Sequence, residues 1–178
     1  MRVLIVGAGV TGLTLWRCLA RRGMHAEIVD RALGASVAPR PFMLAAHAFP
    51  AAEDAGVMAT VRRLGAEIAP REGVGPVAIA TSFVGLTEAL ADGVPVGRGV
   101  ALTELVREGE RIVGAVVREH GTAGARRIDT DLVVAADGVG SPTRALAGIA
   151  AVRTPTPDGH LSFLSPVRAE VPFRMRFL

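Results

Sequence analysis

Short apolar runs, broken by glycine or by charge, recur along the chain and predict alternating strands and helices. Residues 2–6 are apolar and β-branched and end at a glycine, which is typical of a short buried parallel strand. A helical pattern follows over about residues 10–22 and stops at Gly23, a suitable C-terminal cap. Residues 26–30 predict a second strand, so the chain begins with a right-handed βαβ unit.

The next part of the chain mixes helical and strand signals. We expect a helical stretch over about residues 42–64, interrupted near Pro50, and a Gly- and Pro-rich break at residues 71–76. A further helix is predicted at residues 83–91, and a short strand at residues 94–96. This region therefore leads from the first βαβ unit to a second group of strands.

Three strand signals then predict a three-stranded β-meander, and they lie at residues 100–107, 111–118 and 126–129. Residues 131–136 restore a buried strand of the parallel type and end in Asp137-Gly138. We therefore expect one domain over residues 1–150. Beyond it, prolines weaken the pattern, so residues 151–178 are expected to form partial strands of a substrate domain or a tail.

Composition narrows the possible functions. Half of the 178 residues are hydrophobic, which disfavours disorder, and no apolar run reaches the roughly 20 residues of a membrane span. An early glycine cluster disfavours a signal peptide, so we expect a cytoplasmic protein with no membrane partner. Because every basic residue is arginine, Schiff-base chemistry through lysine is excluded.

Neither the charge nor the potential metal ligands indicate a further partner or site. The formal net charge is only +3 and the arginines are spread along the chain without interleaved aromatics, so we expect no nucleic-acid partner. The single cysteine, Cys18, is expected to be a small buried side chain of the first helix. The four histidines have no close metal-ligand spacing, and we expect no metal site.

The glycine pattern between the first strand and the first helix matches G-x-G-x-x-G in the context that this motif requires. Gly7 allows the tight turn, Gly9 lets the backbone approach a pyrophosphate, and Gly12 lets the helix pack closely on the strand. The start of the helix offers unpaired N–H groups and a positive dipole end to phosphates. The candidate cofactor-binding residues of this loop are Gly7, Ala8, Gly9, Val10, Thr11 and Gly12.

Asp30 ends the second strand, close to the roughly 20-residue spacing of the dinucleotide-binding fingerprint. Its carboxylate can accept hydrogen bonds from both hydroxyls of an adenosine ribose, and it would repel a 2′-phosphate. The alternative is a Gly-rich turn with an acid on the surface. The matching strand, helix and acid favour a site for the ADP half of a dinucleotide.

Other pieces of sequence accompany this opening, namely Arg31 after Asp30, Arg40, the run Val96-Gly-Arg-Gly-Val100, and the run Asp137-Gly-Val-Gly-Ser-Pro-Thr-Arg144. Gly138 after a buried strand permits a sharp turn against a cofactor, and the Asp137 carboxylate can bind water or a backbone donor. Ser141 before Pro142 is suited to cap a short helix. The alternative for this last run is a strand end and a capped helix with no ligand.

The order of elements separates two cofactor classes. A nicotinamide dehydrogenase would continue with βα units after the second strand, whereas this chain inserts a β-meander before residues 131–136. It resembles an α/β fold, the Rossmann-like FAD-binding fold of the glutathione-reductase type, and more closely the FAD-dependent monooxygenases, or flavoprotein aromatic hydroxylases. The resemblance implies FAD as cofactor, NAD(P)H as reductant and an aromatic or polycyclic small-molecule substrate.

The same resemblance implies roles for individual residues. Asp30-Arg31 is similar to the family's Glu-Arg pair, and Arg40 stands where the family keeps an arginine near the FAD ribose and pyrophosphate. The Val100 backbone would meet the adenine, while Asp137 and Gly138 belong to a motif linked to FAD and to NAD(P)H docking. No catalytic residue is implied.

Members of that family are longer and carry a second Gly-Asp motif late in the chain, which this sequence does not contain. The resemblance therefore covers the N-terminal FAD-binding portion, and the expectation is a truncated form. Three hypotheses stay open. The chain is a monooxygenase-like oxidoreductase, active alone or completed by a second protein chain; or it is a non-catalytic FAD- or nucleotide-binding module or partner subunit; or it is an unstable remnant.

Overall fold

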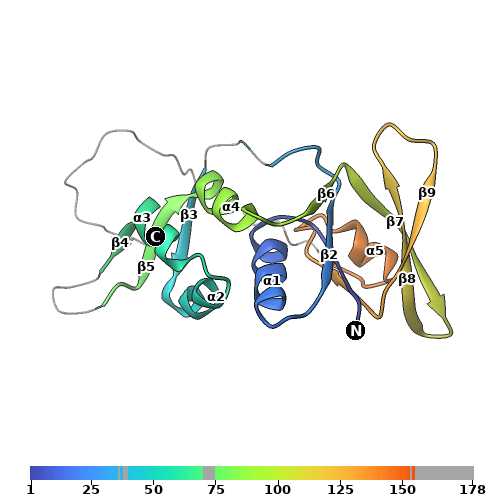
Figure 1. The fold of residues 1–178 in the computed structure, drawn as a ribbon, viewed down its shortest axis with the longest axis horizontal. Coiled ribbons are helices and arrows are strands. Elements are labelled where there is room, and N and C mark those ends of the chain that lie inside the picture. Colours follow the sequence, from blue (N-terminus) through green and yellow to red (C-terminus); the bar gives the residue numbers. More distant parts are fainter. Residues whose placement is uncertain (36, 38–39, 70–74, 153, 155–178) are drawn as a thin grey trace.

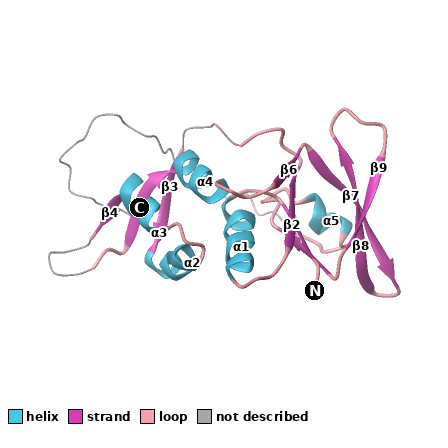
Figure 2. Ribbon diagram, viewed as in Figure 1, coloured by secondary structure: helices cyan, strands magenta, loops and turns pink. Residues whose placement is uncertain are grey.

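The computed structural model describes residues 1–35, 37, 40–69, 75–152 and 154. Three sheets follow one another along the long axis of the molecule, with the parallel sheet in the middle (Figures 1 and 2). Helices lie between the parallel sheet and the sheet at one end, while the meander forms the other end.

The parallel sheet has the strand order β10-β1-β2-β6. Its strands are β1 (Val3–Val6), β2 (Ala26–Asp30), β6 (Val96–Arg98) and β10 (Leu132–Ala135). Helix α1 (Val10–Arg21) connects β1 to β2, so the predicted βαβ opening and the return of the chain at β10 are both confirmed. The strand predicted at residues 94–96 begins two residues later, at Val96.

Alternate residues of the parallel sheet enter two different cores. Ile5 and Ile28 are buried on the face that carries α1 and α4 (Phe83–Ala91), a helix found where it was predicted. Leu4 and Val29 are buried on the opposite face, against the meander. The sheet is covered on both faces, which explains why its strands read as continuous apolar runs.

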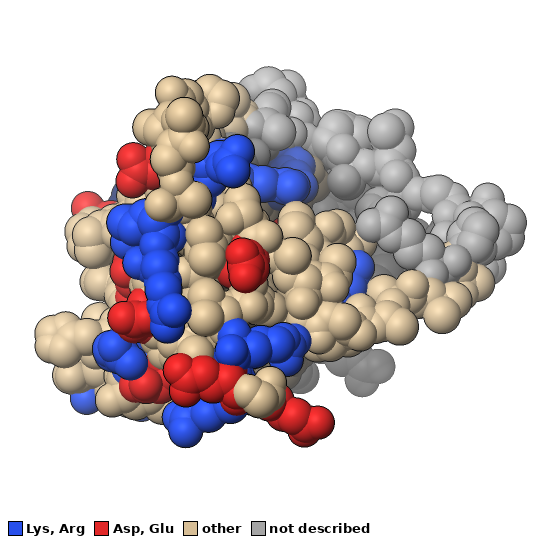
Figure 3. Space-filling model, turned by 90° about the vertical axis from the view of Figure 1, so that its right-hand side faces the viewer, with Lys and Arg blue, Asp and Glu red and all other residues tan. Residues whose placement is uncertain are grey.

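The meander is confirmed as an antiparallel sheet of the order β7-β8-β9. Its strands are β7 (Val100–Glu108), β8 (Arg111–Glu119) and β9 (Ala125–Asp129). Gly109 takes a positive φ of 61° in the tight turn between β7 and β8. At this end of the molecule, arginines are interspersed with acidic side chains rather than gathered into one positive patch (Figure 3).

The third sheet corrects the prediction of a helix from residue 42. Its antiparallel order is β3-β5-β4, and the strands are β3 (Pro41–Ala45), β4 (Ala66–Ile68) and β5 (Ala78–Ser82). Proline is tolerated as the first residue of an edge strand, because it has no N–H for the ladder. Phe42 also gains an aromatic neighbour, since its ring centroid lies 6.1 Å from that of Phe83. A short apolar run such as residues 42–46 does not distinguish strand from helix by periodicity.

The helical part of that stretch begins only after β3. It consists of a 3₁₀ turn at Ala46–Ala48, α2 (Phe49–Asp54) and α3 (Met58–Leu64). Pro50 lies in the first turn of α2, where its missing N–H costs nothing, so it helps to start this helix rather than interrupting one.

Two side chains fix α1 against its surroundings. The Trp16 indole Nε1 donates to the carbonyl oxygen of Ala26 at 2.8 Å, which ties the helix to the start of β2. The Arg17 guanidinium donates to the carbonyl oxygens of Ala55 at 2.7 Å and Asp92 at 2.8 Å. Because these carbonyls follow α2 and α4, Arg17 joins three helices.

Most of the break predicted at residues 71–76 and most of the tail predicted at residues 151–178 lie outside the described residues. The division at residue 150 stays a prediction. Within the described part of the chain, no helix combines the length and apolar character needed to cross a membrane.

Candidate functional site

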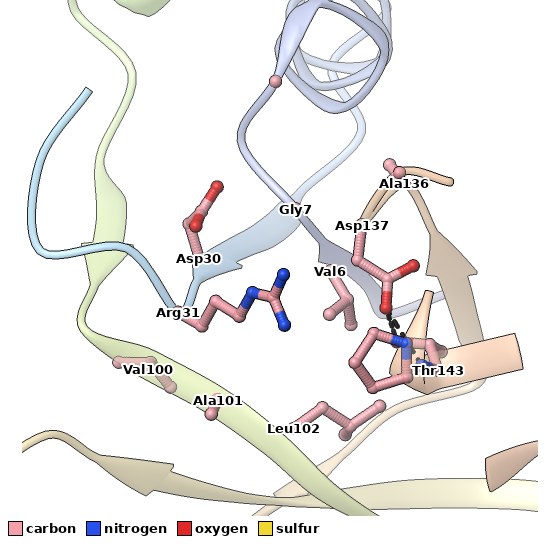
Figure 4. Close-up of a pocket in the computed structure, with 13 residues that line it drawn as sticks. Val6, Gly7, Asp30, Arg31, Val100, Ala101, Leu102, Ala136, Asp137 and Thr143 are labelled. Carbon is pink, nitrogen blue, oxygen red and sulfur yellow. Dashed lines mark hydrogen bonds between the residues drawn. The ribbon is translucent and has the colours of Figure 1, made fainter. Parts of the chain in front are cut away.

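A cavity of about 380 Å³ opens at the carboxyl edge of the parallel sheet, between the ends of β1 and β2, the start of β7, and α5 (Pro142–Leu146). Ligands of open α/β sheets bind at this edge. Figure 4 shows Asp30 and Arg31 on one side, Asp137 on the other, and Val100 to Leu102 along β7. The predicted site residues that line the cavity are Gly7, Gly9, Asp30, Arg31, Val100, Asp137 and Gly138.

The three glycines of the loop are required for different reasons. Gly7 has a φ of 107°, and a Cβ there would overlap the carbonyl oxygen of Ala136. A Cβ on Gly12 would overlap the carbonyl oxygen of Gly7, so this glycine permits close packing of α1 on the loop. A Cβ on Gly9 would meet no atom within 4 Å. The loop therefore needs Gly7 and Gly12 in order to fold, whereas Gly9 leaves open space beside the backbone.

Asp30 is hydrogen-bonded to two loops through both of its oxygens. Oδ2 accepts the N–H of Ala8 at 2.7 Å, and Oδ1 accepts the N–H of Ala32 at 2.8 Å. Nη1 of Arg98 lies 3.8 Å from Oδ2. Each carboxylate oxygen can accept more than one hydrogen bond, so Asp30 still has capacity for ribose hydroxyls. The predicted ribose acceptor also shapes the glycine loop.

Asp137 follows β10 and is bonded to the first turn of α5. Its Oδ2 accepts the Thr143 N–H at 2.9 Å and the Thr143 hydroxyl at 2.7 Å. Burial by itself would raise the pKa of Asp137, but hydrogen bonds from Ser141 and Thr143 outweigh it and hold the pKa below its ordinary value. The other oxygen, Oδ1, is buried without a hydrogen-bond partner among the described residues.

The predicted cap of α5 is confirmed. Ser141 Oγ accepts the N–H of Arg144 at 2.9 Å, and Pro142 occupies the first turn of the helix. The same short helix supplies Thr143, so the cap also places the partner of Asp137.

A second cavity of about 510 Å³ lies beside the first and is lined by Ala8, Arg40, Phe83 and Arg98. Gly9 and Asp30 line both cavities. The guanidinium carbon of Arg40 lies 3.8 Å from the centroid of the Phe83 ring. The two cavities therefore lie on either side of Gly9 and Asp30.

Val10 and Thr11 are placed differently from the other predicted residues. They line a third, mostly apolar hollow of about 400 Å³ among α1, α2 and α4. Only their main chain, in the first turn of α1, remains near the loop. Sequence reasoning did not single out Arg98 and Thr143, although both lie inside the runs that it quoted. Their relevance depends on which residues they face, namely Asp30 and Asp137.

No cluster of three potential metal ligands (His, Cys, Asp or Glu) occurs in the part of the chain that the structure describes. The site instead combines a glycine loop, the start of a helix, two carboxylates and arginines. This donor set fits the ADP part of FAD, because open space at Gly9 and unused acceptor capacity at Asp30 lie at the same cavity, which Asp137 also lines.

Comparison with protein families gives a direct match. The model of the FAD binding domain matches residues 1–93 and 86–175. No curated protein matches the chain.

Solved structures match over most of the described fold. The substrate-free rebeccamycin biosynthetic enzyme RebC is 21% identical with a TM-score of 0.69, and the match covers 83% of this chain and 35% of that one. A putative FAD-containing monooxygenase from Photorhabdus luminescens subsp. laumondii TTO1 is 21% identical with a TM-score of 0.66, covering 81% and 41%. The flavin-dependent monooxygenase PieE in complex with FAD and substrate is 19% identical with a TM-score of 0.67, covering 83% and 32%.

The chain thus spans about a third of the length of RebC and PieE. At these identities the structural likeness establishes the fold, and the resemblance expected from the sequence is confirmed for the FAD-binding fold of these enzymes. The match to the family model covers nearly the whole chain. The chain therefore belongs to the FAD binding domain family and has the α/β, Rossmann-like fold that this domain adopts in flavin monooxygenases.

Proposed function

We propose that this chain binds FAD and serves as the cofactor-binding part of an NAD(P)H-dependent oxidoreductase of the flavin monooxygenase type. The observation that carries the proposal is the pair of cavities that share Gly9 and Asp30 at the end of the parallel sheet. Together they accommodate a dinucleotide rather than a mononucleotide. The cytoplasmic location expected from the sequence belongs to the same proposal.

In this proposal, different residues bind different parts of the ADP half of FAD. Val100 and its neighbours on β7 contact the adenine, and Asp30 accepts the ribose hydroxyls. The start of α1 at Gly9, with Arg40, holds the diphosphate. Asp137 lines the same cavity and holds the turn from β10 into α5 through Thr143. Bound FAD supplies the redox chemistry, and the protein binds and orients it.

An aromatic or polycyclic substrate is part of the proposal for the complete enzyme. Support comes from the fold shared with a rebeccamycin biosynthetic enzyme and with a flavin-dependent monooxygenase complexed with FAD and substrate. No residue of this chain is assigned to catalysis.

A second candidate function is a non-catalytic FAD-binding module or partner subunit, completed by another protein chain. The shared FAD-binding fold supports this candidate as well, because cofactor binding does not require the rest of those enzymes to be part of the same function. Both candidates require FAD binding, and they differ in whether NAD(P)H reduces the bound flavin.

The test is a titration of the purified chain with FAD, followed by flavin fluorescence and by thermal unfolding. We expect saturable binding and a rise in the unfolding temperature with FAD concentration. Gly9→Val is the control, because its side chain would fill the space beside the loop. If wild type and Gly9→Val respond alike, the proposed site is wrong.

Anaerobic addition of NADH or NADPH to the FAD complex separates the two functions. Bleaching of the flavin absorbance supports the oxidoreductase. Bound flavin that stays oxidised with both nucleotides supports the non-catalytic module.

A further inference from the structure

The second cavity carries more positive charge than a ribose site needs. Arg40 and Arg98 line it with two guanidinium groups, and Asp30 is the one carboxylate among the described residues that line it. The first turn of α1 also begins at this cavity, with the positive end of the helix dipole. Asp30 carries one negative charge against two guanidinium groups, so it neutralises only part of this charge. The cavity therefore favours an anion.

Arg98 is held close to Asp30 by the sheet. Strand β6 pairs with β2 in parallel, and the register sets Arg98 beside Asp30. The Arg98 side chain is only 24% exposed, and its Nη1 lies 3.8 Å from Oδ2 of Asp30. A guanidinium has five N–H donors, and among the described residues this ion pair is the only polar side-chain contact of Arg98. Most of its donors remain available to a ligand in the cavity.

Arg40 is held by a different contact. Its guanidinium stacks on the face of Phe83 at 3.8 Å, and its carbonyl oxygen accepts the Phe83 N–H at 3.0 Å. Stacking uses the flat face of a guanidinium and leaves the N–H groups along its edge for planar anions such as phosphate. Arg98 on β6 and Arg40 just before β3 thus line the same cavity, next to the glycine loop.

We propose that Arg98 is a second phosphate-binding arginine, which with Arg40 clamps the diphosphate of the bound dinucleotide. Asp30 positions Arg98, and Phe83 positions Arg40. This inference rests on the proposed function, because it assigns further residues to the same ligand. The competing role for Arg98 is purely structural, in which it only orients Asp30 toward the ribose.

Two ligands distinguish these roles, because ADP contains the diphosphate and adenosine does not. Binding of ADP to the full chain is measured by calorimetry, and binding of adenosine by ligand-detected NMR. We expect Arg98→Gln to weaken ADP binding about tenfold and to leave adenosine binding unchanged, since a charge-assisted phosphate contact is lost. An equal loss for both ligands, or no loss for ADP, would overturn the proposal.

Arg98→Lys keeps the charge without the planar fork, and we expect a smaller loss of ADP affinity than in Arg98→Gln. This variant also serves if Arg98→Gln fails to fold. Arg63→Gln is the matched control, because it removes one exposed positive charge from α3, outside both cavities. If Arg63→Gln weakens ADP binding as much as Arg98→Gln does, the effect is general electrostatics and the clamp is wrong.

Phe83 is tested in the same assay. Phe83→Leu keeps an apolar side chain but removes the ring face, and we expect a severalfold loss of ADP affinity that Phe83→Tyr restores. Unchanged ADP binding in Phe83→Leu would remove Phe83 from the proposal. A wild-type chain that binds neither ADP nor FAD contradicts the proposed function itself, whereas normal ADP binding in Arg98→Gln contradicts only this inference.

Discussion

Asp30 and Asp137 lie on the two sides of β1 at the same edge of the parallel sheet, yet their carboxylates are used differently. Both oxygens of Asp30 accept main-chain N–H groups, from Ala8 in the glycine loop and from Ala32 after β2. Asp137 gives one oxygen to the N–H and hydroxyl of Thr143, and its other oxygen has no partner among the described residues. The first carboxylate shapes the glycine loop, and the second holds the turn into α5.

The glycine loop connects the two sides. The N–H of Gly7 donates to the carbonyl oxygen of Val29, on the Asp30 side, at 2.8 Å. On the other side, Gly7 packs so closely against Ala136 that no Cβ fits between them. A substitution in the loop therefore either disturbs the fold or fills the space for the ligand, depending on which glycine is replaced.

The largest effect is expected from Gly7→Ala. Its Cβ would overlap the backbone at Ala136, and its φ of 107° is strained for alanine. We expect a loss of about 3 kcal/mol or more in the free energy of unfolding. For a chain of this size the unfolding temperature would fall by about 6–12 °C. Calorimetry or circular dichroism measures it.

Gly9→Ala is the matched variant, because its Cβ meets no atom within 4 Å and its φ of −84° suits alanine. We expect its unfolding temperature to stay the same or rise slightly, while FAD affinity falls about tenfold as the methyl group occupies ligand space. Equal stability losses in Gly7→Ala and Gly9→Ala would show that the two glycines do not have separate roles.

The sequence predicted the parallel sheet well and the β3-β5-β4 sheet poorly, for a physical reason. Strand β1 is buried along its whole length, and β2 and β10 pack Ile28, Val29, Val133 and Val134 against the two cores. These strands therefore read as short apolar runs that lead to glycine or aspartate. Strand β3 pairs with β5, which comes after α2 and α3 in the chain. No local period records such a distant partner, and residues 42–46 fit a helix equally well until the pairing is known.

The candidate site divides in the same way. Backbone requirements, such as those of Gly7 and Gly12, leave a clear mark on the sequence because only glycine satisfies them. Contacts between side chains leave no such mark on the sequence. That Arg98 faces Asp30 depends on the β2–β6 register, and that Thr143 bonds Asp137 depends on the turn into α5.

A smaller effect tests the contrast between the two carboxylates directly. Asp30→Asn replaces one oxygen with an NH₂ group that must face the N–H of Ala8 or Ala32, so two donors meet. We expect a loss of about 2 kcal/mol in stability, together with weaker FAD binding. Urea unfolding measures the first and flavin fluorescence the second.

Asp137→Asn is expected to behave differently. Its amide oxygen can keep both bonds from Thr143, and its NH₂ group replaces the oxygen that has no partner. Stability should change by less than about 1 kcal/mol, and FAD affinity should fall less than in Asp30→Asn, because the substituted atom is buried away from the cavity. A loss of stability in Asp137→Asn as large as that in Asp30→Asn would contradict the difference drawn between the two carboxylates.

The smallest effect is expected in the dependence of stability on acidic pH. Because its hydrogen bonds hold the pKa of Asp137 below the ordinary value, this carboxylate adds stability above the unfolded-state pKa of about 3.9 and loses it as the pH falls through the folded-state pKa. Thr143→Val removes the hydroxyl donor from Oδ2. We expect it to be about 1 kcal/mol less stable than wild type at neutral pH, and the gap to narrow in acid.

Thr87→Val is the control for the expected narrowing of the stability gap between Thr143→Val and wild type in acid. Thr87 is also a buried threonine, 5% exposed against 3% for Thr143, but its hydroxyl donates to the carbonyl oxygens of Phe83 and Val84. Carbonyls do not titrate, so the stability gap between Thr87→Val and wild type should stay constant from neutral pH down to about pH 3. Urea unfolding at several pH values measures both gaps. Parallel behaviour of the two variants would mean that the Thr143 hydroxyl does not stabilise the charged form of Asp137.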